Sequence, residues 1–375
     1  MRKIKIGYLI SHLGNTGPVN ILYGIIKYLD RNKFEPYIFT LKEEGKDSRE
    51  KEFRELNIEI LKNRINSFNI IFKNNIFLEK KIKKLRLDIL HAHGLESTIL
   101  LSKIKIEDSK KMTTIHCDLE KDFAYNFGQL KGAILKKLYV NSLKKIENNI
   151  SCGEGIKKLN KASLGIESIT IMNGIDEEKI NLKNIIETKK EIRKKLGVNE
   201  EKKIFITIGL IDERKNVLFL AEVFKKYLKE HVLIIIGDGE KRIELEKLLK
   251  ECKNIHYYGK KDLLGIQYYL KCSDFYISAS RSEGIPNSVL EALQFNLPLI
   301  LSDIEAHREI IQLNDKIGFI FENNNEIDLK KKIEKIVNLK IKMDEFEKIY
   351  KKISAKRMTN DYMKIYKKII FGENK

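Results

Sequence analysis

The sequence of 375 residues has few features of a membrane-spanning or exported protein. Its longest apolar runs, residues 232–236 and 297–301, have the length of a β-strand and are too short to span a bilayer. The first ten residues alternate like a strand and lack the apolar stretch and cleavage site of a signal peptide. We therefore expect a cytoplasmic protein.

Cysteines are scarce and scattered. The sequence contains four: Cys117, Cys152, Cys252 and Cys272. They form no Cys-x-x-Cys pair and no zinc-binding spacing, so we expect reduced thiols and no redox role. Short repeats, low-complexity tracts and Asp-x-Asp pairs are also missing.

The chain carries a formal net charge of +19. This excess favours an anionic partner, which could be a nucleic acid, an anionic lipid or a nucleoside diphosphate. Both halves share the charge, so neither is a basic tail. The sequence has no zinc-finger, RRM-like or aromatic-interleaved basic motif, and we therefore do not expect a nucleic-acid partner.

The length and a hydrophobic content of 42% predict two domains, each with its own core. Strand-like and helix-like segments alternate in both halves: residues 3–10, 18–29 and 34–40, then 203–208 and 217–229. Such alternation predicts an α/β fold with parallel sheets. We place the domains at 1–180 and 181–375 with a linker at about 177–190. The last helix, about 356–372, could pack back on the N-terminal domain.

One βαβ unit in the second half is centred on residues 282–291, Ser-Glu-Gly-Ile-Pro-Asn-Ser-Val-Leu-Glu. A strand-like run precedes this stretch, and helical sequence and a second strand follow it. Gly284 suits the turn, and Pro286 suits the first helical position, which needs no amide hydrogen. Asn296 can adopt the left-handed conformation that ends a helix.

Two carboxylates frame this turn, Glu283 at its lip and Glu291 inside the helix. The neighbours of Glu291 are apolar: Val289, Leu290, Ala292 and Leu293. We therefore expect Glu291 to be buried, which is costly unless a partner donates hydrogen bonds to it. A lysine of the same chain is one candidate partner, and vicinal hydroxyls of a bound sugar are another. The first-turn amides of the helix could face a phosphate.

The Glu-x7-Glu spacing within Glu-Gly-x-Pro-Asn-Ser-x-Leu-Glu-Ala resembles the donor-site signature of retaining glycosyltransferases of family four. The resemblance extends from about residue 3 to about residue 350. It implies the GT-B fold, in which two Rossmann-like domains face each other across a cleft. It further implies that the second domain holds a nucleotide-sugar and the first an acceptor, with transfer that retains the anomeric configuration.

The family also has a cationic loop, and residues 209–216 correspond to it. Arg214 and Lys215 could neutralise a diphosphate there, or they could form a solvated helix end. Lys215 matches the family lysine, whereas Leu210 stands where the family usually has arginine, so Arg214 would have to replace that cation. The resemblance implies that Glu283 positions the donor sugar, that Glu291 binds ribose hydroxyls and that no metal is required.

The first half contributes a glycine loop and three histidines. Gly14 and Gly17 lie in a loop that follows the first strand but lacks the full Gly-x-Gly-x-x-Gly spacing. A metal site at His91 and His93 lacks a third ligand, so packing at the strand end is the simpler role. His116 ends another strand, where ligands of α/β sheets bind, although a lone histidine is often structural. In the resembled family the corresponding histidine faces the donor sugar.

The predicted site residues follow from these matches. The catalytic set is His116, Glu283 and Lys215. The donor-binding set is Gly14, Gly17, Arg214, Lys215, Gly237, Gly284, Ile285, Pro286, Asn287, Ser288 and Glu291. The donor is expected to be a UDP-sugar, because UDP-sugars are more frequent donors in the family than GDP- or ADP-sugars.

The expected acceptor is a glycan or a lipid-linked glycan of cell-surface polysaccharide synthesis. Residues 72–86 and 130–146 are both basic and apolar, which suits either an amphipathic helix packed on a sheet or a peripheral helix on an anionic membrane surface. A GT-B nucleotide-sugar 2-epimerase and a non-catalytic nucleotide-sugar-binding relative are the alternatives. The sequence carries no signal for an oligomeric state.

Overall fold

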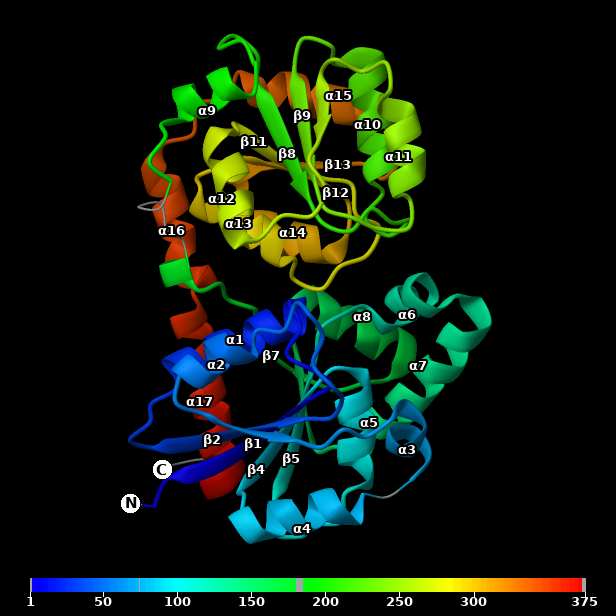
Figure 1. The fold of residues 1–375 in the computed structure, drawn as a ribbon, viewed down its shortest axis with the longest axis vertical. Helices are drawn as coiled ribbons and strands as arrows, with labels where there is room; N and C mark the ends of the chain where they lie inside the picture. Colours follow the sequence, from blue (N-terminus) through cyan, green and yellow to red (C-terminus); the bar gives the residue numbers. More distant parts are fainter. Residues whose placement is uncertain (1, 74, 180–184, 373–375) are drawn as a thin grey trace. The chain divides into compact units, whose positions relative to one another are not determined.

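The computed structural model describes residues 2–73, 75–179 and 185–372, and it divides into two α/β units (Figure 1). The first unit comprises Met1–Ile175 and Ile353–Lys375, and the second comprises Asp176–Lys352. The predicted boundary at residue 180 and the middle of the predicted linker lie outside the described residues. The C-terminal segment thus belongs to the same unit as the N-terminal half.

The first unit is built on a parallel sheet of seven strands in the order β3-β2-β1-β4-β5-β6-β7. Its strands are β1 (Ile4–Ile10), β2 (Phe34–Thr40), β3 (Glu59–Lys62), β4 (Ile89–His93), β5 (Lys110–Ile115), β6 (Asn148–Ser151) and β7 (Ile169–Thr170). Its helices are α1 (Gly17–Tyr28), α2 (Glu50–Glu55), α3 (Ser67–Phe72), α4 (Ile76–Leu85), α5 (Leu95–Lys103), α6 (Leu119–Phe127), α7 (Gln129–Leu143), α8 (Glu154–Leu164) and α17 (Ala355–Phe371).

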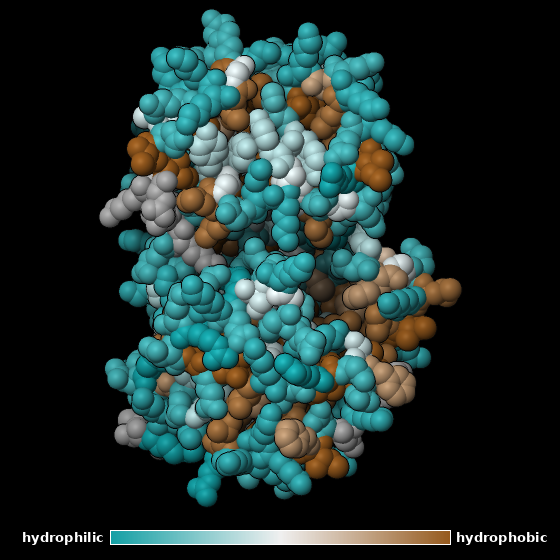
Figure 2. Space-filling view, in the orientation of Figure 1, coloured by the Kyte–Doolittle hydropathy of each residue, from teal (hydrophilic) through white to brown (hydrophobic). Residues whose placement is uncertain are grey.

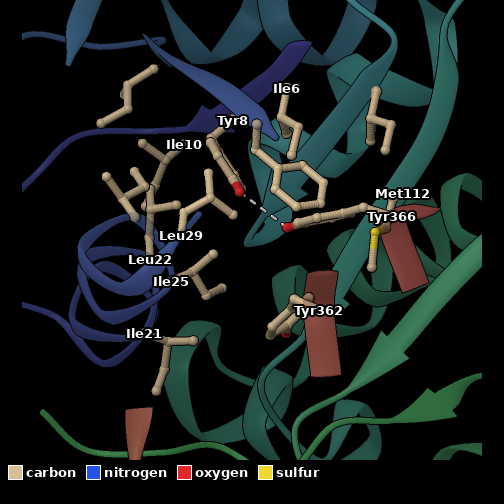
Figure 3. Close-up of a cluster of buried hydrophobic side chains, with 14 of the residues drawn as sticks. Ile6, Tyr8, Ile10, Ile21, Leu22, Ile25, Leu29, Met112, Tyr362 and Tyr366 are labelled. Carbon is tan, nitrogen blue, oxygen red and sulfur yellow. Dashed lines mark hydrogen bonds between the residues drawn. The ribbon is translucent and has the colours of Figure 1, made fainter. Parts of the chain in front are cut away.

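Strand β1 is buried on both faces, as expected for the interior of a parallel sheet. Ile6, Tyr8 and Ile10 point into a core that they share with α1 and α17 (Figure 3). Leu9 points the other way, into a core shared with α4 and α5. The period of two along a strand explains this split, and the predicted strand at residues 3–10 is confirmed.

Helix α17 completes the core beneath β1. Tyr362 and Tyr366 are fully buried, and the hydroxyl of Tyr366 lies 3.2 Å from that of Tyr8 (Figure 3). The helix also crosses α1 closely, since a Cβ on Gly24 would lie 3.2 Å from the Cβ of Ala355. Removing α17 would therefore expose one face of the first sheet.

The second unit contains a six-stranded parallel sheet in the order β10-β9-β8-β11-β12-β13. Its strands are β8 (Ile204–Ile208), β9 (Val232–Ile236), β10 (Ile255–Tyr257), β11 (Phe275–Ser278), β12 (Leu299–Ser302) and β13 (Gly318–Phe321). Its helices are η1 (Glu177–Lys179), α9 (Lys189–Lys195), α10 (Val217–Tyr227), α11 (Arg242–Leu249), α12 (Leu263–Cys272), α13 (Asn287–Gln294), α14 (Glu305–Ile311), η3 (Asp315–Ile317), α15 (Glu326–Val337) and α16 (Met343–Ile353).

Each sheet has one point where the strand order reverses. In the first sheet the reversal lies between β1 and β4, and in the second it lies between β8 and β11. Ligands of such sheets bind outside the carboxyl ends of the strands at this switch point. In the second unit the loops at that point are residues 209–216 and 279–286, which hold the predicted donor-binding residues Arg214, Lys215, Gly284, Ile285 and Pro286.

Two local predictions need correction. Pro286 is not the first residue of α13 but precedes it in an extended conformation, with φ −75° and ψ 119°. Residues 72–86 are not one helix, because α3 ends at Phe72 and the Asn75 side chain caps a new helix by accepting from the Leu78 amide at 2.9 Å. The left-handed conformation predicted at Asn296 is confirmed, with φ 58°.

Candidate active site

An ion cluster occupies the carboxyl edge of the second sheet at its switch point. The guanidinium of Arg214, from the loop after β8, donates to the Glu283 carboxylate at 2.9 Å. The ammonium of Lys215 forms an ion pair with the other oxygen of the same carboxylate. Arg214 also donates to the carbonyl of Ser282 at 3.0 Å. The structure thus brings together three of the predicted site residues.

Glu283, next to the turn at Gly284, is buried within this cluster, and its side chain is only 8% exposed. Burial by itself raises the pKa of a carboxyl group, but the charges of Lys215 and Arg214 lower the pKa of Glu283 to about 2. The carboxylate is therefore ionised at neutral pH. Within this group of three residues the two cations exceed the single carboxylate by one charge.

The backbone positions both cations. The amide of Lys215 donates to the Asp212 carboxylate at 2.7 Å, and the amide of Arg281 donates to the carbonyl of Arg214 at 2.8 Å. The Lys215 side chain runs across Gly209, where an added Cβ would lie 3.1 Å from Cε of the lysine. A glycine at position 209 therefore leaves space for the lysine side chain.

A second polar cluster braces the same loops, and the sequence did not reveal it. Arg281 and Lys241 both form ion pairs with Glu213. The amide group of Asn216 donates to the side-chain oxygen of Asn324 at 3.0 Å. Both asparagines are left-handed, with φ of 53° and 59°, a conformation that asparagine tolerates better than most residues. Asparagine is a weak sequence signal for a left-handed turn residue. The pairings themselves could not be predicted, because the partners are distant in sequence.

Glu291 is only partly buried, so the prediction of a buried acid at this position is wrong. Its sequence neighbours Leu290 and Ala292 are buried, but they point away from it around the helix. The residues that share its face at helical spacing are Asn287, Ser288, Gln294 and Phe295, and all of them are partly exposed. Glu291 thus lies on the more solvent-exposed face of α13.

The start of α13 contributes polar groups beside the ion cluster. Ser288, in its first turn, accepts a hydrogen bond from the buried Tyr276 hydroxyl at 2.8 Å. Burial raises the pKa of that tyrosine, and Glu283 and Glu291 raise it further. The first turn of α13 contains no acidic residue, so its amides favour an anion.

Gly237 is a predicted donor-binding residue, and Leu210 stands where the family usually has arginine. A Cβ on Gly237 would lie 1.7 Å from the carbonyl oxygen of Gly209, so this glycine allows two loops to pack. Leu210 is 52% exposed and brings no charge to the edge of the sheet. The second cation next to Glu283 is Arg214.

The first unit presents histidines at its own switch point. His93, at the end of β4, and His116, after β5, face each other with 3.2 Å between Nδ1 of His93 and Nε2 of His116. His91 is fully buried and contacts the hydroxyls of Tyr366 at 2.9 Å and Thr114 at 2.8 Å. The predicted packing role of His91 fits these contacts.

All three imidazoles are neutral at physiological pH. Burial lowers the pKa of His91 to about 3 and that of His116 to about 4. The pKa of His93 is lowered by burial and by the neighbouring His91 and His116. This edge therefore offers uncharged hydrogen-bonding groups, in contrast to the ions of the second unit.

The glycine loop of the first unit leads directly into α1. The amide of Gly14 donates to Nδ1 of His12 at 3.0 Å, and α1 begins at Gly17. Thr16 precedes the helix without a side-chain cap, and the first turn has no acidic residue. Its amides are available to an anion or a sugar oxygen.

The described residues contain neither a metal-binding group nor a membrane-spanning helix. No group of three or more histidine, cysteine, aspartate or glutamate side chains there is arranged to hold a metal ion. Likewise, none of the helices described is both long and apolar enough to cross a bilayer.

Two family models match the chain and together span most of it. The model of glycosyl transferases group 1 matches residues 188–353, and that of glycosyltransferase family 4 matches residues 16–179. The chain is a group 1 glycosyltransferase of family four. The resemblance seen around residues 282–291 is thus confirmed over residues 16–179 and 188–353.

Curated relatives agree with this assignment. An uncharacterised glycosyltransferase of Methanocaldococcus jannaschii is 36% identical over 128 residues, which span only 31% of this chain and 31% of that relative. The UDP-Gal:α-D-GlcNAc-diphosphoundecaprenol α-1,3-galactosyltransferase of Escherichia coli is 28% identical over 275 residues, or 68% of this chain and 67% of the relative.

Solved structures show the same fold. A glycosyltransferase from Rickettsia africae superposes with a TM-score of 0.77 at 21% identity, covering 100% of both chains. Anabaena HepE, solved in complex with UDP and glucose, gives a TM-score of 0.75 at 12% identity over 96% of this chain and 99% of HepE. The glycosyltransferase has the predicted GT-B fold of two Rossmann-like domains.

Proposed function

We propose that this glycosyltransferase transfers a sugar from a UDP-sugar to a glycan or lipid-linked glycan of the cell surface, with retention of the anomeric configuration. The cluster of Arg214, Lys215 and Glu283 supports this proposal most directly. It offers two cations against one carboxylate beside a helix start that is free of acidic residues. A diphosphate would match both features.

The residues have separate roles in this proposal. Lys215 and Arg214 stabilise the negative charge that develops on the leaving diphosphate. Glu283 holds the two cations in place and positions the donor sugar, and Glu291 binds the ribose hydroxyls from the more solvent-exposed face of α13. The acceptor oxygen bonds to the anomeric carbon on the face from which the diphosphate leaves, and the leaving diphosphate takes the hydroxyl proton. Neither a protein nucleophile nor a protein base is then needed. His116 contacts the sugar, and the cations make a metal ion unnecessary.

A donor screen tests the proposal. Thermal-shift measurements with UDP-, GDP- and ADP-sugars should show the largest stabilisation with a UDP-sugar, because a tight ligand stabilises by mass action. NMR of the product formed on a lipid-linked glycan acceptor should show the anomeric configuration of the donor. An epimerised UDP-N-acetylglucosamine without acceptor would support the 2-epimerase alternative. Donor binding without transfer to any acceptor would support the alternative of a non-catalytic nucleotide-sugar-binding protein.

The ribose contact can be tested separately. We expect Glu291→Gln to weaken UDP about tenfold, because a carboxylate accepts stronger hydrogen bonds than an amide. 2′-Deoxy-UDP should lose clearly less affinity than UDP in the variant, because it lacks one of the two hydroxyls that Glu291 is proposed to hold. An equal loss of affinity for both ligands would contradict the proposed contact between Glu291 and the ribose.

An apolar surface on the first unit suits a lipid-linked acceptor. Helices α6 and α7 pack closely, since a Cβ on Gly132 would lie 2.5 Å from the carbonyl oxygen of Phe123. Leu130 is 85% exposed and Ile134 63% exposed, and Figure 2 shows hydrophobic atoms gathered over these helices. The exposed lysines on the same pair are Lys121, Lys131 and Lys137. We propose that this surface docks on anionic lipid.

Flotation with vesicles tests the docking. Vesicles that contain anionic phosphatidylglycerol should carry the protein, and purely zwitterionic vesicles should carry much less. Leu130→Glu should reduce flotation, whereas the control Ile243→Glu, at an exposed position on α11, should not. Equal flotation on both kinds of vesicle would contradict the docking.

A further inference from the structure

The contact between His93 and His116 joins two neutral rings. Nδ1 of His93 lies 3.2 Å from Nε2 of His116, and no other hydrogen bond to His116 occurs in the described part of the chain. A neutral imidazole has one N–H donor and one acceptor nitrogen. Of the two facing nitrogens, one must therefore donate and the other accept.

The remaining nitrogen of His93 distinguishes the two arrangements. Nε2 of His93 is buried and has no partner among the described residues. If Nδ1 of His93 accepts, then Nε2 carries a hydrogen that is buried without an acceptor. If Nδ1 donates, then Nε2 is only an unused acceptor. Orphaned buried N–H groups are rarer in proteins than under-used acceptors.

We infer that His93 donates through Nδ1 to Nε2 of His116 and thereby fixes His116 in the tautomer with its hydrogen on Nδ1. The side chain of His116 is partly exposed. Its Nδ1–H is then a permanent donor to a bound oxygen, and its only basic nitrogen is occupied by His93. His116 binds a substrate hydroxyl or phosphate oxygen and cannot serve as a general base, and His93 is its positioning residue.

The substrate part of this inference rests on the proposed function, whereas the tautomer does not. The ring of His93 is itself held by its neighbours, because its centroid lies 4.3 Å from that of His91. His91 is fixed by hydroxyls from Thr114 and Tyr366. The strand-end histidines thus form one packed group in which the orientation of His93 is determined.

Nitrogen-15 NMR of the full chain labelled at histidine tests the tautomer without any substrate. Correlations from the ring hydrogens to both nitrogens distinguish a protonated from an unprotonated nitrogen, and the signals lost in His116→Gln identify His116. We expect a protonated Nδ1 and an unprotonated Nε2 at His116. A protonated Nε2, or averaged signals from both tautomers, would overturn the inference.

Two variants of equal size test the consequence for transfer. An asparagine at position 93 can still donate to Nε2 of His116, whereas an aspartate can only accept. We expect His93→Asp to shift the hydrogen of His116 to Nε2 and to give a kcat at least about tenfold below that of His93→Asn, the effect of one misplaced hydrogen bond. Equal kcat values would overturn the positioning role.

The two claims fail separately. If no nucleotide-sugar is turned over while the labelled spectrum shows the expected tautomer, the proposed function is wrong and the histidine arrangement stands. If turnover is observed while the spectrum shows the opposite tautomer, the inferred histidine arrangement is wrong and the proposed function stands. The spectrum of the unchanged protein decides the tautomer even if neither variant folds.

Discussion

The carboxyl edges of the two sheets can be compared directly, because both sheets reverse their strand order at one point and present loops there. In the second unit this edge holds Arg214, Lys215 and Glu283, which are all charged. In the first unit it holds His93 and His116, which are neutral. The same topology therefore places charged side chains at this edge in one unit and neutral imidazoles in the other.

This difference supports the proposed division of donor and acceptor between the two units. Buried ions are costly unless they are paired, so a group of two cations and one carboxylate favours a further anion such as a diphosphate. Neutral imidazoles and hydroxyls favour neutral hydroxyl groups, which sugars offer. Four predictions test the contrast, in order of decreasing effect.

Glu283→Gln should give the largest loss of stability. It leaves Arg214 and Lys215 facing each other without an anion, and breaking a buried pair costs about 3–5 kcal/mol. UDP should restore part of that free energy, because its diphosphate replaces the missing charge. Urea denaturation with and without UDP measures both effects. Glu120→Gln, at an exposed ion pair with Lys136, is the control and should cost less than about 1 kcal/mol.

Acid should weaken the first unit more than the second. Burial lowers the pKa of three histidines in the first unit, His91, His93 and His116, and of His307 in the second. Burial also lowers the pKa values of His231 and His256 in the second unit, but these two side chains are only half-buried. As the pH falls, the histidines of the unfolded chain are protonated before the buried ones. The free energy of unfolding therefore falls below about pH 6.5, by about 1.4 kcal/mol per pH unit for each such histidine. Glu283 adds to the loss only below about pH 4.5, because its folded pKa is lowered to about 2.

Hydrogen exchange at pH 7 and pH 5, corrected for the intrinsic rate, measures this difference. Amides of β4 should lose more protection between the two pH values than amides of β8. Equal losses in both strands would show that the neutral histidines do not set the acid sensitivity of the first unit.

Tyr366→Phe should cost about 1–3 kcal/mol, because it removes the hydroxyl that contacts both His91 and Tyr8 and leaves a buried imidazole nitrogen unsatisfied. Tyr8→Phe is the matched control, since it removes one hydrogen bond and leaves the contact between Tyr366 and His91. Urea denaturation should rank Tyr366→Phe as the more destabilising change. The opposite ranking would mean that the histidine contact contributes little.

Chelation of metal ions should have the smallest effect. Arg214 and Lys215 are proposed to supply the positive charge that a metal ion would otherwise provide. We expect EDTA to change the UDP dissociation constant less than about twofold, within the scatter of such measurements. A tenfold weakening that magnesium reverses would show that the cation pair is insufficient.

The local pattern of the sequence predicted much of the fold. The strand at residues 34–40 matches β2 at both ends, and the turn, helix and left-handed Asn296 around residues 282–296 lie within one position of their predicted places. These features depend on alternation and on turn residues, which act over a few positions. The cation pair and Glu283 were also found, because residues 209–216 and 282–291 resemble motifs of the family.

The remaining features depend on contacts between distant residues. The burial of Glu291 was misjudged because its sequence neighbours were considered instead of the helix face that it shares with Ser288 and Phe295. The pairing of Arg281 with Glu213 joins loops that only the folded sheet brings together. The hydrogen bonds from Tyr362 and Tyr366 to Thr114 and His91 likewise require the last helix to be in place.

Calorimetric titration with UDP and uridine tests the central claim, that the cation pair after β8 binds a diphosphate. Lys215→Met keeps the length of the side chain and removes its charge. We predict that this variant binds UDP at least about tenfold more weakly and binds uridine as the unchanged enzyme does, because uridine has no phosphate. Unchanged UDP binding in Lys215→Met, or equal weakening of both ligands, would contradict the claim.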